Sequence, residues 1–257
     1  MKMLFLGDIV GNPGREAVAR HVPLLRRSGA VDAVVANAEN AAGGSGITEA
    51  VARELFSFGC DVLTLGDHVW DKREVYPFLN AAPNIVRPAN FPADVPGRGL
   101  CVVEIHGVRV AVLALLGRTF MKYLTDCPFR ALDSLLAGLV DVKVVVVDMH
   151  AEATSEKVAM GWYADGRVSA VLGTHTHIQT ADEKILPGKT AYITDAGMTG
   201  PYDSVIGQVK GLIINRYLTG MPSKFEVAAQ PATLCGVIVD VDEATGHARG
   251  ITRIQKD

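Results

Sequence analysis

The chain has 257 residues, a formal net charge of −3 and 49% hydrophobic residues. This balance is typical of a globular protein that buries a core without disulfides or a structural metal, and it argues against disorder. The net charge excludes an overall basic field, so we expect no stable nucleic-acid complex, although a small nucleotide is not excluded as a substrate.

Cysteine usage and the short apolar runs make the cytoplasm the default location. The four cysteines show no CxxC pairing, and Cys60 and Cys101 lie in or beside apolar runs, which favours reduced core thiols. The apolar run at residues 3–6 ends at Gly7-Asp8, so it does not resemble a signal peptide. No run approaches the ~20 apolar residues of a membrane span, and we expect no membrane segment.

The first part of the chain alternates predicted strands and helices. Residues 3–6 are predicted to form a strand, followed by a glycine-rich turn at 7–14 and a helix over 15–25. A buried strand over 33–36 and a small-residue loop at 37–46 precede a helix through residue 58, for which Thr48 is a good N-cap. Another strand covers residues 62–65. Such alternation predicts an α/β fold with buried parallel strands.

The later part adds antiparallel pairs. Two apolar runs at 100–105 and 108–115 flank a predicted tight hairpin at His106-Gly107, and a second hairpin joins 234–241 to 248–254. Strands are also predicted over 142–147 and 168–172. We therefore expect a layered structure with a mixed sheet or two sheets, folded as a single domain over residues 1–257.

Carboxylates and imidazoles follow five of the predicted strands. Asp8 follows the first, and Glu39 and Asn40 lie three residues beyond the second. The remaining three strands are followed by Asp67 and His68, by His150, and by His175 and His177. Each residue alone is commonly a turn, a cap or a hydrogen-bonded structural histidine. Together they predict a site, since ligands bind at the carboxyl edge of open α/β sheets.

The pair His175 and His177 is the sharpest local signal. In an extended backbone, residues i and i+2 point to the same side, so both imidazoles would reach one region. Imidazole with carboxylate suits zinc, manganese or iron, and the lack of thiolates argues against a structural zinc site. There are enough ligands for two metals, and a carboxylate bridging ions ~3.5–4 Å apart would polarise phosphoryl oxygens.

Other anion-binding signals are weaker. The glycine-rich segments at 11–14 and 43–46 could approach a phosphate, but neither matches a P-loop, and flexible turns explain them as well. Arg118 follows a predicted strand, where it could bind a substrate anion or form a surface salt bridge.

Several motifs together resemble the calcineurin-like metallophosphoesterases, and within them the YmdB-like bacterial phosphodiesterases. They are Gly-Asp-Ile-Val-Gly at 7–11, Asn-Ala-Glu-Asn at 37–40, Gly-Asp-His at 66–68, His-Ala-Glu at 150–152 and Gly-Thr-His-Thr-His at 173–177. The resemblance implies a double β-sandwich flanked by helices and the hydrolysis of phosphodiesters, with 2′,3′-cyclic nucleotides as candidate substrates. It is also compatible with a homo-oligomer.

The same resemblance implies a role for each motif residue. One metal would be held by Asp8, Glu39, Asn40 and His177, and a second by Glu39, Asp67, His150 and His175. The ions would be iron or manganese, with zinc as the alternative, and the nucleophile would be metal-bound hydroxide. His68 would act as general acid or stabilise the phosphoryl charge.

Two positions depart from the broad superfamily pattern. The usual Asp-x-His is absent after Asp8, and Asn40 is expected to replace that histidine as a ligand. Asp67 stands where asparagine is usual, so two divalent ions with Asp8, Glu39, Asp67 and a hydroxide give a neutral cluster, one charge unit less positive than with asparagine. We therefore predict that Asp67 binds metal more tightly but activates water less.

Two other classes remain as alternatives. A binding or regulatory protein could retain the metal site with little turnover. A metal-dependent amidohydrolase also gathers histidine and aspartate at strand ends, but it commonly uses a bridging lysine, for which the sequence offers no candidate.

Overall fold

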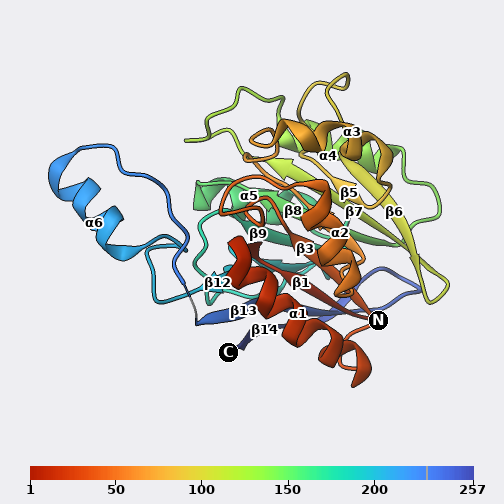
Figure 1. The fold of residues 1–257 in the computed structure, drawn as a ribbon. Helices are drawn as coiled ribbons and strands as arrows, with labels where there is room; N and C mark the ends of the chain where they lie inside the picture. The colour runs from red at the N-terminus through yellow and green to blue at the C-terminus, as the bar shows by residue number, and fades with distance from the viewer. Residues whose placement is uncertain (230) are drawn as a thin grey trace.

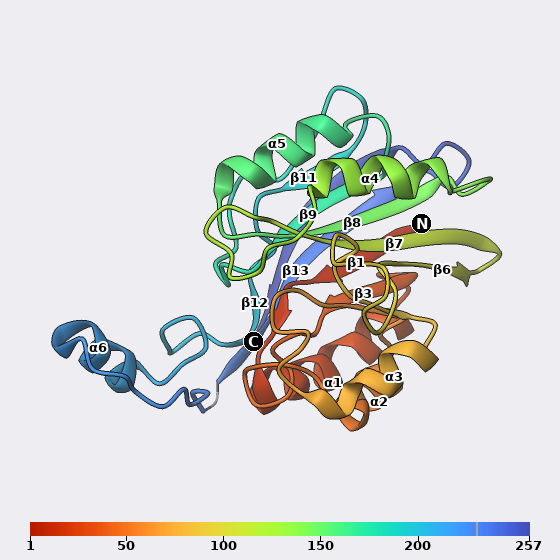
Figure 2. The ribbon, with the colours of Figure 1, turned by 90° about the horizontal axis from the view of Figure 1, so that it is seen from above.

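Two β-sheets stacked face to face form the centre of the computed structural model, which describes residues 1–229 and 231–257 (Figure 1). Helices α1, α2 and α3 lie on the outer side of one sheet, and α4 and α5 lie on the outer side of the other (Figure 2). The helices are α1 (Gly11–Arg27), α2 (Glu49–Ser57), α3 (Tyr76–Ala81), α4 (Pro128–Ala137), α5 (Thr154–Ala164) and α6 (Lys210–Thr219), with a 3₁₀ turn at Arg73–Val75.

The first sheet has the strand order β2-β12-β13-β1-β3-β4-β5, with β14 paired to β13. Its strands are β1 (Lys2–Leu6), β2 (Asp8–Ile9), β3 (Ala33–Asn37), β4 (Val62–Thr64), β5 (Ile85–Val86), β12 (Met198–Pro201), β13 (Ala232–Val241) and β14 (Ala248–Lys256). The second sheet has the order β10-β11-β9-β8-β7-β6. Its strands are β6 (Leu100–Ile105), β7 (Val108–Leu116), β8 (Val144–His150), β9 (Ala170–Thr174), β10 (Lys184–Ile185) and β11 (Ala191–Ile193).

The core between the sheets explains the apolar composition of the central strands. Met3, Phe5 and Val35 of the first sheet pack in one cluster with Val112 and Val146 of the second. Because helices cover the outer faces, β3 and β8 are buried along their whole length, as the unbroken β-branched runs predict. The predicted layered α/β fold with two sheets is confirmed.

Parallel pairing gives each sheet a common carboxyl edge. Strands β1, β3, β4 and β5 run parallel in the first sheet, as do β7, β8, β9 and β11 in the second. Both predicted hairpins are present as antiparallel pairs, β6 with β7 and β13 with β14. The Thr48 side chain accepts a hydrogen bond from the Val51 N–H, so the predicted cap of α2 is also confirmed.

The predicted glycine-rich turn at 7–14 is wrong in its second half, because α1 already begins at Gly11. The reason is close packing: a Cβ on Gly14 would lie 2.3 Å from the Thr199 carbonyl oxygen of β12. Glycine at this position lets the first turn of α1 approach β12, so residues 11–14 pack against that strand. Strand β8 is also longer than predicted, since it continues to His150.

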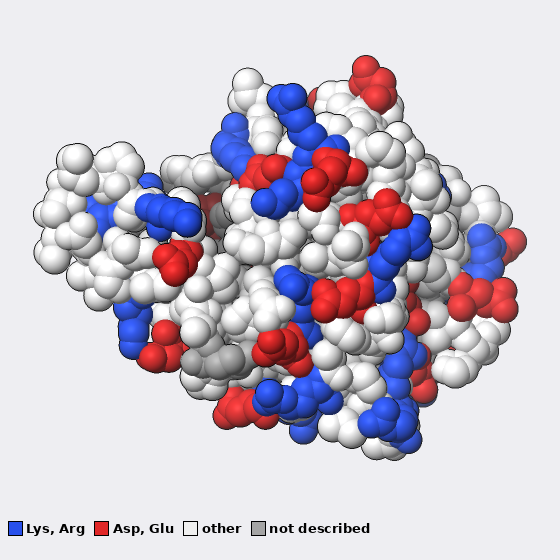
Figure 3. All heavy atoms as spheres, viewed as in Figure 1, with Lys and Arg blue, Asp and Glu red and all other residues white. Residues whose placement is uncertain are grey.

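The surface carries mixed charge, and one helix stands apart. Lysine and arginine alternate with aspartate and glutamate over the face in Figure 3, without a large patch of one sign. Helix α6 projects away from the two sheets in both ribbon views (Figures 1 and 2). Within the described residues, no helix combines the length and apolar character needed to cross a bilayer.

Candidate metal centre

Four of the predicted ligands converge on one point. Glu39, Asp67, His150 and His175 each offer a ligand atom, and these atoms all lie within 4.8 Å of one another. Glu39 and Asp67 follow strands of the first sheet, whereas His150 ends β8 and His175 follows β9 of the second. The expectation of one edge of a single sheet is therefore corrected: the carboxyl edges of two stacked sheets meet at the site.

His150 lies at the centre of this group and is fully buried. Its Nε2 lies 3.1 Å from Glu39 Oε1 and 3.1 Å from Asp67 Oδ1, while Nδ1 lies 2.9 Å from Thr174 Oγ1. Burial opposes the charged imidazolium, yet the two carboxylates raise the pKa of His150 well above its usual value. A position where buried carboxylates favour a positive charge this strongly is suited to a cation.

The carboxylates show the reciprocal effect. Although burial opposes their ionisation, His150 lowers the pKa of Glu39 below its usual value. For Asp67, burial is likewise outweighed by hydrogen bonds from His150 and His175, which hold the pKa well below the ordinary range. Both groups are thus carboxylates at neutral pH, the form that binds a metal ion.

His175 reaches the cluster through Nδ1, which lies 3.0 Å from His150 Nε2, and its Nε2 lies 3.1 Å from Glu152 Oε2. A carboxylate on the far nitrogen orients an imidazole and leaves the near nitrogen as the ligand. The backbone here is not extended, because φ is +101° at His175 and +65° at His177, so the i, i+2 argument does not apply. This left-handed conformation costs on the order of 1–3 kcal/mol per residue, so the surrounding structure must hold it.

The remaining predicted ligands form an adjoining group. His177 Nε2 lies 3.3 Å from Asn40 Nδ2 and 3.8 Å from Asp8 Oδ1. Asn40 Nδ2 in turn donates to Glu39 Oε1 at 3.4 Å, so Glu39 contacts both groups. The Nδ1–H of His177 donates to the Ile206 carbonyl at 2.9 Å, which leaves Nε2 as the acceptor.

A buried ion pair stabilises the loop that carries His175 and His177. Lys157 Nζ lies 2.6 Å from Asp195 Oδ2 and donates to the Thr174 carbonyl at 2.7 Å, and both side chains are essentially fully buried. Asp195 also accepts hydrogen bonds from the backbone N–H and the hydroxyl of Thr176. This network fixes the loop that carries both histidines, and sequence reasoning missed it because the partners are 38 residues apart.

A further buried carboxylate, Asp148, lies on the same strand as His150. Asp148 accepts hydrogen bonds from Thr64, Thr174 and Asn37, and burial raises its pKa to about 6. Its partners come from β3, β4 and β9, so Asp148 ties the two sheets together directly behind the metal-binding edge. Sequence reasoning missed this residue because it lies inside an apolar strand.

His68 lies at the entrance of the cluster and is held by two partners. Its Nδ1 is 2.7 Å from Asp71 Oδ2 and 3.2 Å from Ser45 Oγ, and its backbone N–H donates to Glu39 Oε2 at 2.9 Å. With Nδ1 engaged by a carboxylate, Nε2 is the atom available to a ligand. Asp71 and Ser45 were not predicted; the i, i+3 spacing of His68 and Asp71 was the available signal.

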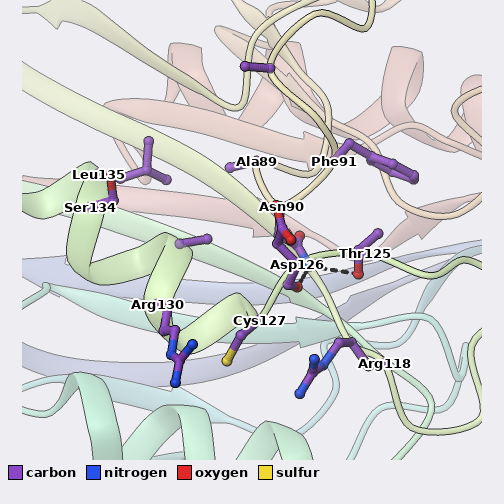
Figure 4. Close-up of a pocket in the computed structure, with 12 residues that line it drawn as sticks. Ala89, Asn90, Phe91, Arg118, Thr125, Asp126, Cys127, Arg130, Ser134 and Leu135 are labelled. Carbon is purple, nitrogen blue, oxygen red and sulfur yellow. Dashed lines mark hydrogen bonds between the residues drawn. The ribbon is translucent and has the colours of Figure 1, made fainter.

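Arg118 lies beside a separate cavity of about 560 Å³ (Figure 4). Its backbone N–H donates to Glu156, and its guanidinium group lies with that of Arg130 on either side of Cys127 (Figure 4). None of the predicted metal ligands lines this cavity. The structure thus does not bring Arg118 into the cluster, and its role in substrate binding stays a prediction.

The donor set fits divalent metal ions. Carboxylate oxygens and imidazole nitrogens are buried or half-buried, within a few ångströms of one another, and each ligating histidine has a partner on its other nitrogen.

Comparisons with known proteins agree with this geometry. A family model described as "YmdB-like protein" matches residues 4–254. A 2′,3′-cyclic-nucleotide 2′-phosphodiesterase of Bacillus subtilis (strain 168) is 49% identical over 255 residues, 99% of this chain and 96% of that protein. A hypothetical protein from Thermus thermophilus has a crystal structure similar at TM-score 0.94 and 42% identity, covering 99% and 98% of the two chains. The crystal structure of a novel phosphatase from Mycoplasma pneumoniae is similar at TM-score 0.93 and 34% identity, covering 99% and 92%.

Proposed function

The chain belongs to the YmdB-like protein family, and from this premise we propose that it is a metal-dependent phosphoric diester hydrolase acting on 2′,3′-cyclic nucleotides. The family predicted from the sequence motifs is thereby confirmed. The observation that carries the proposal is the convergence of Glu39, Asp67, His150 and His175, together with the likeness to a curated relative of that activity.

Two divalent ions per chain, iron or manganese, complete the proposed site. The first ligand group is Asp8, Glu39, Asn40 and His177, and the second is Glu39, Asp67, His150 and His175. Ions bound there would polarise the phosphoryl oxygens and lower the pKa of the attacking water. The shared carboxylate of Glu39 and its burial support the two-metal assignment.

His68 is the proposed general acid. As water attacks phosphorus, one phosphorus–oxygen bond of the cyclic diester breaks, and the leaving sugar oxygen needs a proton. His68 Nε2 would donate that proton, while Asp71 on Nδ1 orients the ring. The nearby loops would hold the nucleoside, with Arg118 as the proposed anion contact.

Hydrolysis of 2′,3′-cyclic AMP with added Mn²⁺ tests the proposal, with His68→Ala compared against His247→Ala. His247 is exposed in the second hairpin, so its variant should retain full activity. His68→Ala should lose roughly 10²–10⁴-fold in turnover, the usual contribution of a general acid. A wild-type protein that binds Mn²⁺ without hydrolysing the diester would instead favour the metal-retaining binding protein.

A further inference from the structure

Lys122 is a cation beside the proposed metal centre that the sequence motifs do not include. Its Nζ lies 3.5 Å from Asp67 Oδ2 and 3.8 Å from Asp71 Oδ1. These two carboxylates are a proposed metal ligand and the partner of the proposed general acid. The lysine therefore lies between the two halves of the proposed catalytic machinery.

The two oxygens of Asp67 face different partners. Oδ1 points at the imidazoles, 3.1 Å from His150 Nε2 and 3.4 Å from His175 Nδ1. Oδ2 points away from them, toward Lys122. One oxygen is thus available to a metal ion, and the other forms an ion pair at the place where an asparagine ligand would carry its neutral amide group.

The loop that carries Lys122 is held at both ends by Asn90, which is 1% exposed. Asn90 Nδ2 lies 2.8 Å from the Leu116 carbonyl oxygen and 2.9 Å from the Asp126 carbonyl oxygen and from Thr125 Oγ1, so its two N–H groups are shared among these acceptors. The Asn90 amide oxygen accepts from the Leu116 N–H, and Figure 4 shows Asn90 beside Thr125 and Asp126. A fully satisfied buried amide of this kind fixes the backbone around it. The loop over residues 117–127 therefore leaves and rejoins the body at defined points.

Aromatic contacts join this loop to the loop that carries Asp67 and His68. Tyr123 packs edge-on against Phe91 at 5.4 Å between ring centroids, and Phe91 packs in the same way against Trp70 at 5.4 Å. Lys122 Nζ also lies 5.0 Å from the centroid of the Tyr123 ring. The Tyr123 ring thus packs against the ammonium group, while the Lys122 side chain stays 44% exposed.

Charge counting suggests a role for Lys122. With Asp67 in place of the usual asparagine, the two-metal cluster loses one unit of positive charge, and the ammonium group of Lys122 restores it at 3.5 Å. We propose that Lys122 is a positioning residue whose charge offsets that of Asp67, so that the pair acts on the metals as a neutral ligand such as asparagine does. This inference rests on the proposed function, and it adds an offsetting charge to the prediction that Asp67 binds metal more tightly but activates water less.

The test is a double-substitution cycle read out by Mn²⁺ affinity of metal-stripped protein, by calorimetry, and by turnover of the cyclic diester. Lys122→Met should bind Mn²⁺ about three- to tenfold more tightly and turn over more slowly, since one unit charge changes near a half-exposed site. Asp67→Asn leaves the ammonium charge unbalanced, so it should bind Mn²⁺ less tightly and, at saturating Mn²⁺, turn over faster. The double variant should return to within about twofold of wild type in both measurements, because the net charge is restored.

Two control variants separate charge from structure. Lys122→Arg keeps the charge and should behave as wild type, whereas Lys2→Met removes a lysine at the start of β1 and should change neither measurement. The difference between Lys122→Met and wild type should also shrink in about 1 M salt, where exposed charges are screened.

The outcomes distinguish this inference from the proposed function. Two outcomes would overturn the charge-offset role and leave the proposed hydrolase function unaffected. One is equal Mn²⁺ affinity in wild type and Lys122→Met, and the other is a double variant that turns over more slowly than both single variants. Wild-type protein that binds no Mn²⁺ would overturn the proposed function and this inference together.

Discussion

The metal centre and the α6 arm (residues 202–227) depart from the usual distribution of side chains in opposite directions. In the centre, Asp8 and His150 are polar and 0% exposed. In the arm, Tyr217 is 84% exposed and Leu218 is 80% exposed. Buried polar groups and exposed large apolar groups are the two informative exceptions to ordinary burial.

The buried polar groups of the centre have hydrogen-bond partners within the chain, whereas the exposed apolar groups of the arm lie on its surface. The buried polar residues are satisfied by one another through a network that spans both sheets, so folding itself prepares a site for a cation. Tyr217 and Leu218 are exposed to solvent, and α6 projects from the body in Figures 1 and 2. The homo-oligomer suggested by the family resemblance stays a prediction, and the exposed apolar side chains of the arm are a candidate surface for it.

The largest effect on stability is expected beneath the centre. Lys157→Met leaves Asp195 charged and unpaired in the interior, and should lower the free energy of unfolding by about 3–5 kcal/mol. Lys210→Met is the matched control in the arm, where the Lys210–Asp203 pair is exposed and should contribute below about 1 kcal/mol. Urea unfolding of both variants measures the contrast, and equal losses would show that the two regions do not differ in this way.

The next effect concerns Glu39, the proposed shared ligand. Glu39→Gln preserves size and burial but removes the charge between the two ligand groups. Turnover should fall at least about 100-fold, since loss of an outer partner of a metal site alone costs roughly 10- to 100-fold. Steady-state kinetics at saturating Mn²⁺ measures it, and near-normal turnover would remove Glu39 from the ligand set.

A smaller, pH-dependent effect is expected at Asp182, outside the centre. Partial burial opposes ionisation, but hydrogen bonds from Thr180 and Thr194 lower the pKa of Asp182 below its usual value. The unfolded chain therefore binds the proton more readily, so the stabilisation is present above the unfolded pKa of about 3.9 and is lost as the pH falls below it. Thermal unfolding should show Asp182→Asn less stable than wild type at pH 6, with the difference shrinking below about pH 4. A difference that does not change with pH would contradict this account.

The smallest effect is expected in the arm. Leu218→Ser removes an apolar side chain that is already exposed, so the free energy of unfolding should change by no more than about 0.5 kcal/mol. Leu63→Ala, at a fully buried position in β4, should cost about 2–5 kcal/mol in the same measurement. A large loss in Leu218→Ser would mean that the arm is packed in solution, as in an oligomer.

The sequence predicted the centre better than its surroundings for a physical reason. Strand ends can be read from local apolar runs, and Asp8, Asp67 and His150 lie at such ends, so their convergence follows from sheet geometry. The positive φ at His175 could not be read locally, because distant residues impose it.

The supporting residues are set by tertiary contacts. Lys122 meets Asp67 from a loop far along the chain, and Lys157 meets Asp195 across 38 positions, so no local pattern marks either pair. The sequence leaves the role of Gly14 open between a phosphate-binding loop and a flexible turn, since the close approach of β12 that requires glycine is visible only in the fold.

Metal stoichiometry tests the central claim most directly. Elemental analysis of protein reconstituted with Mn²⁺ should give about two ions per chain for wild type, the number a shared carboxylate can bridge. Glu39→Gln should hold fewer. Two ions in the wild type and a loss in the variant would support the two-metal centre at the meeting edges of the sheets. A wild type without bound metal, or a variant that still holds two ions, would contradict it.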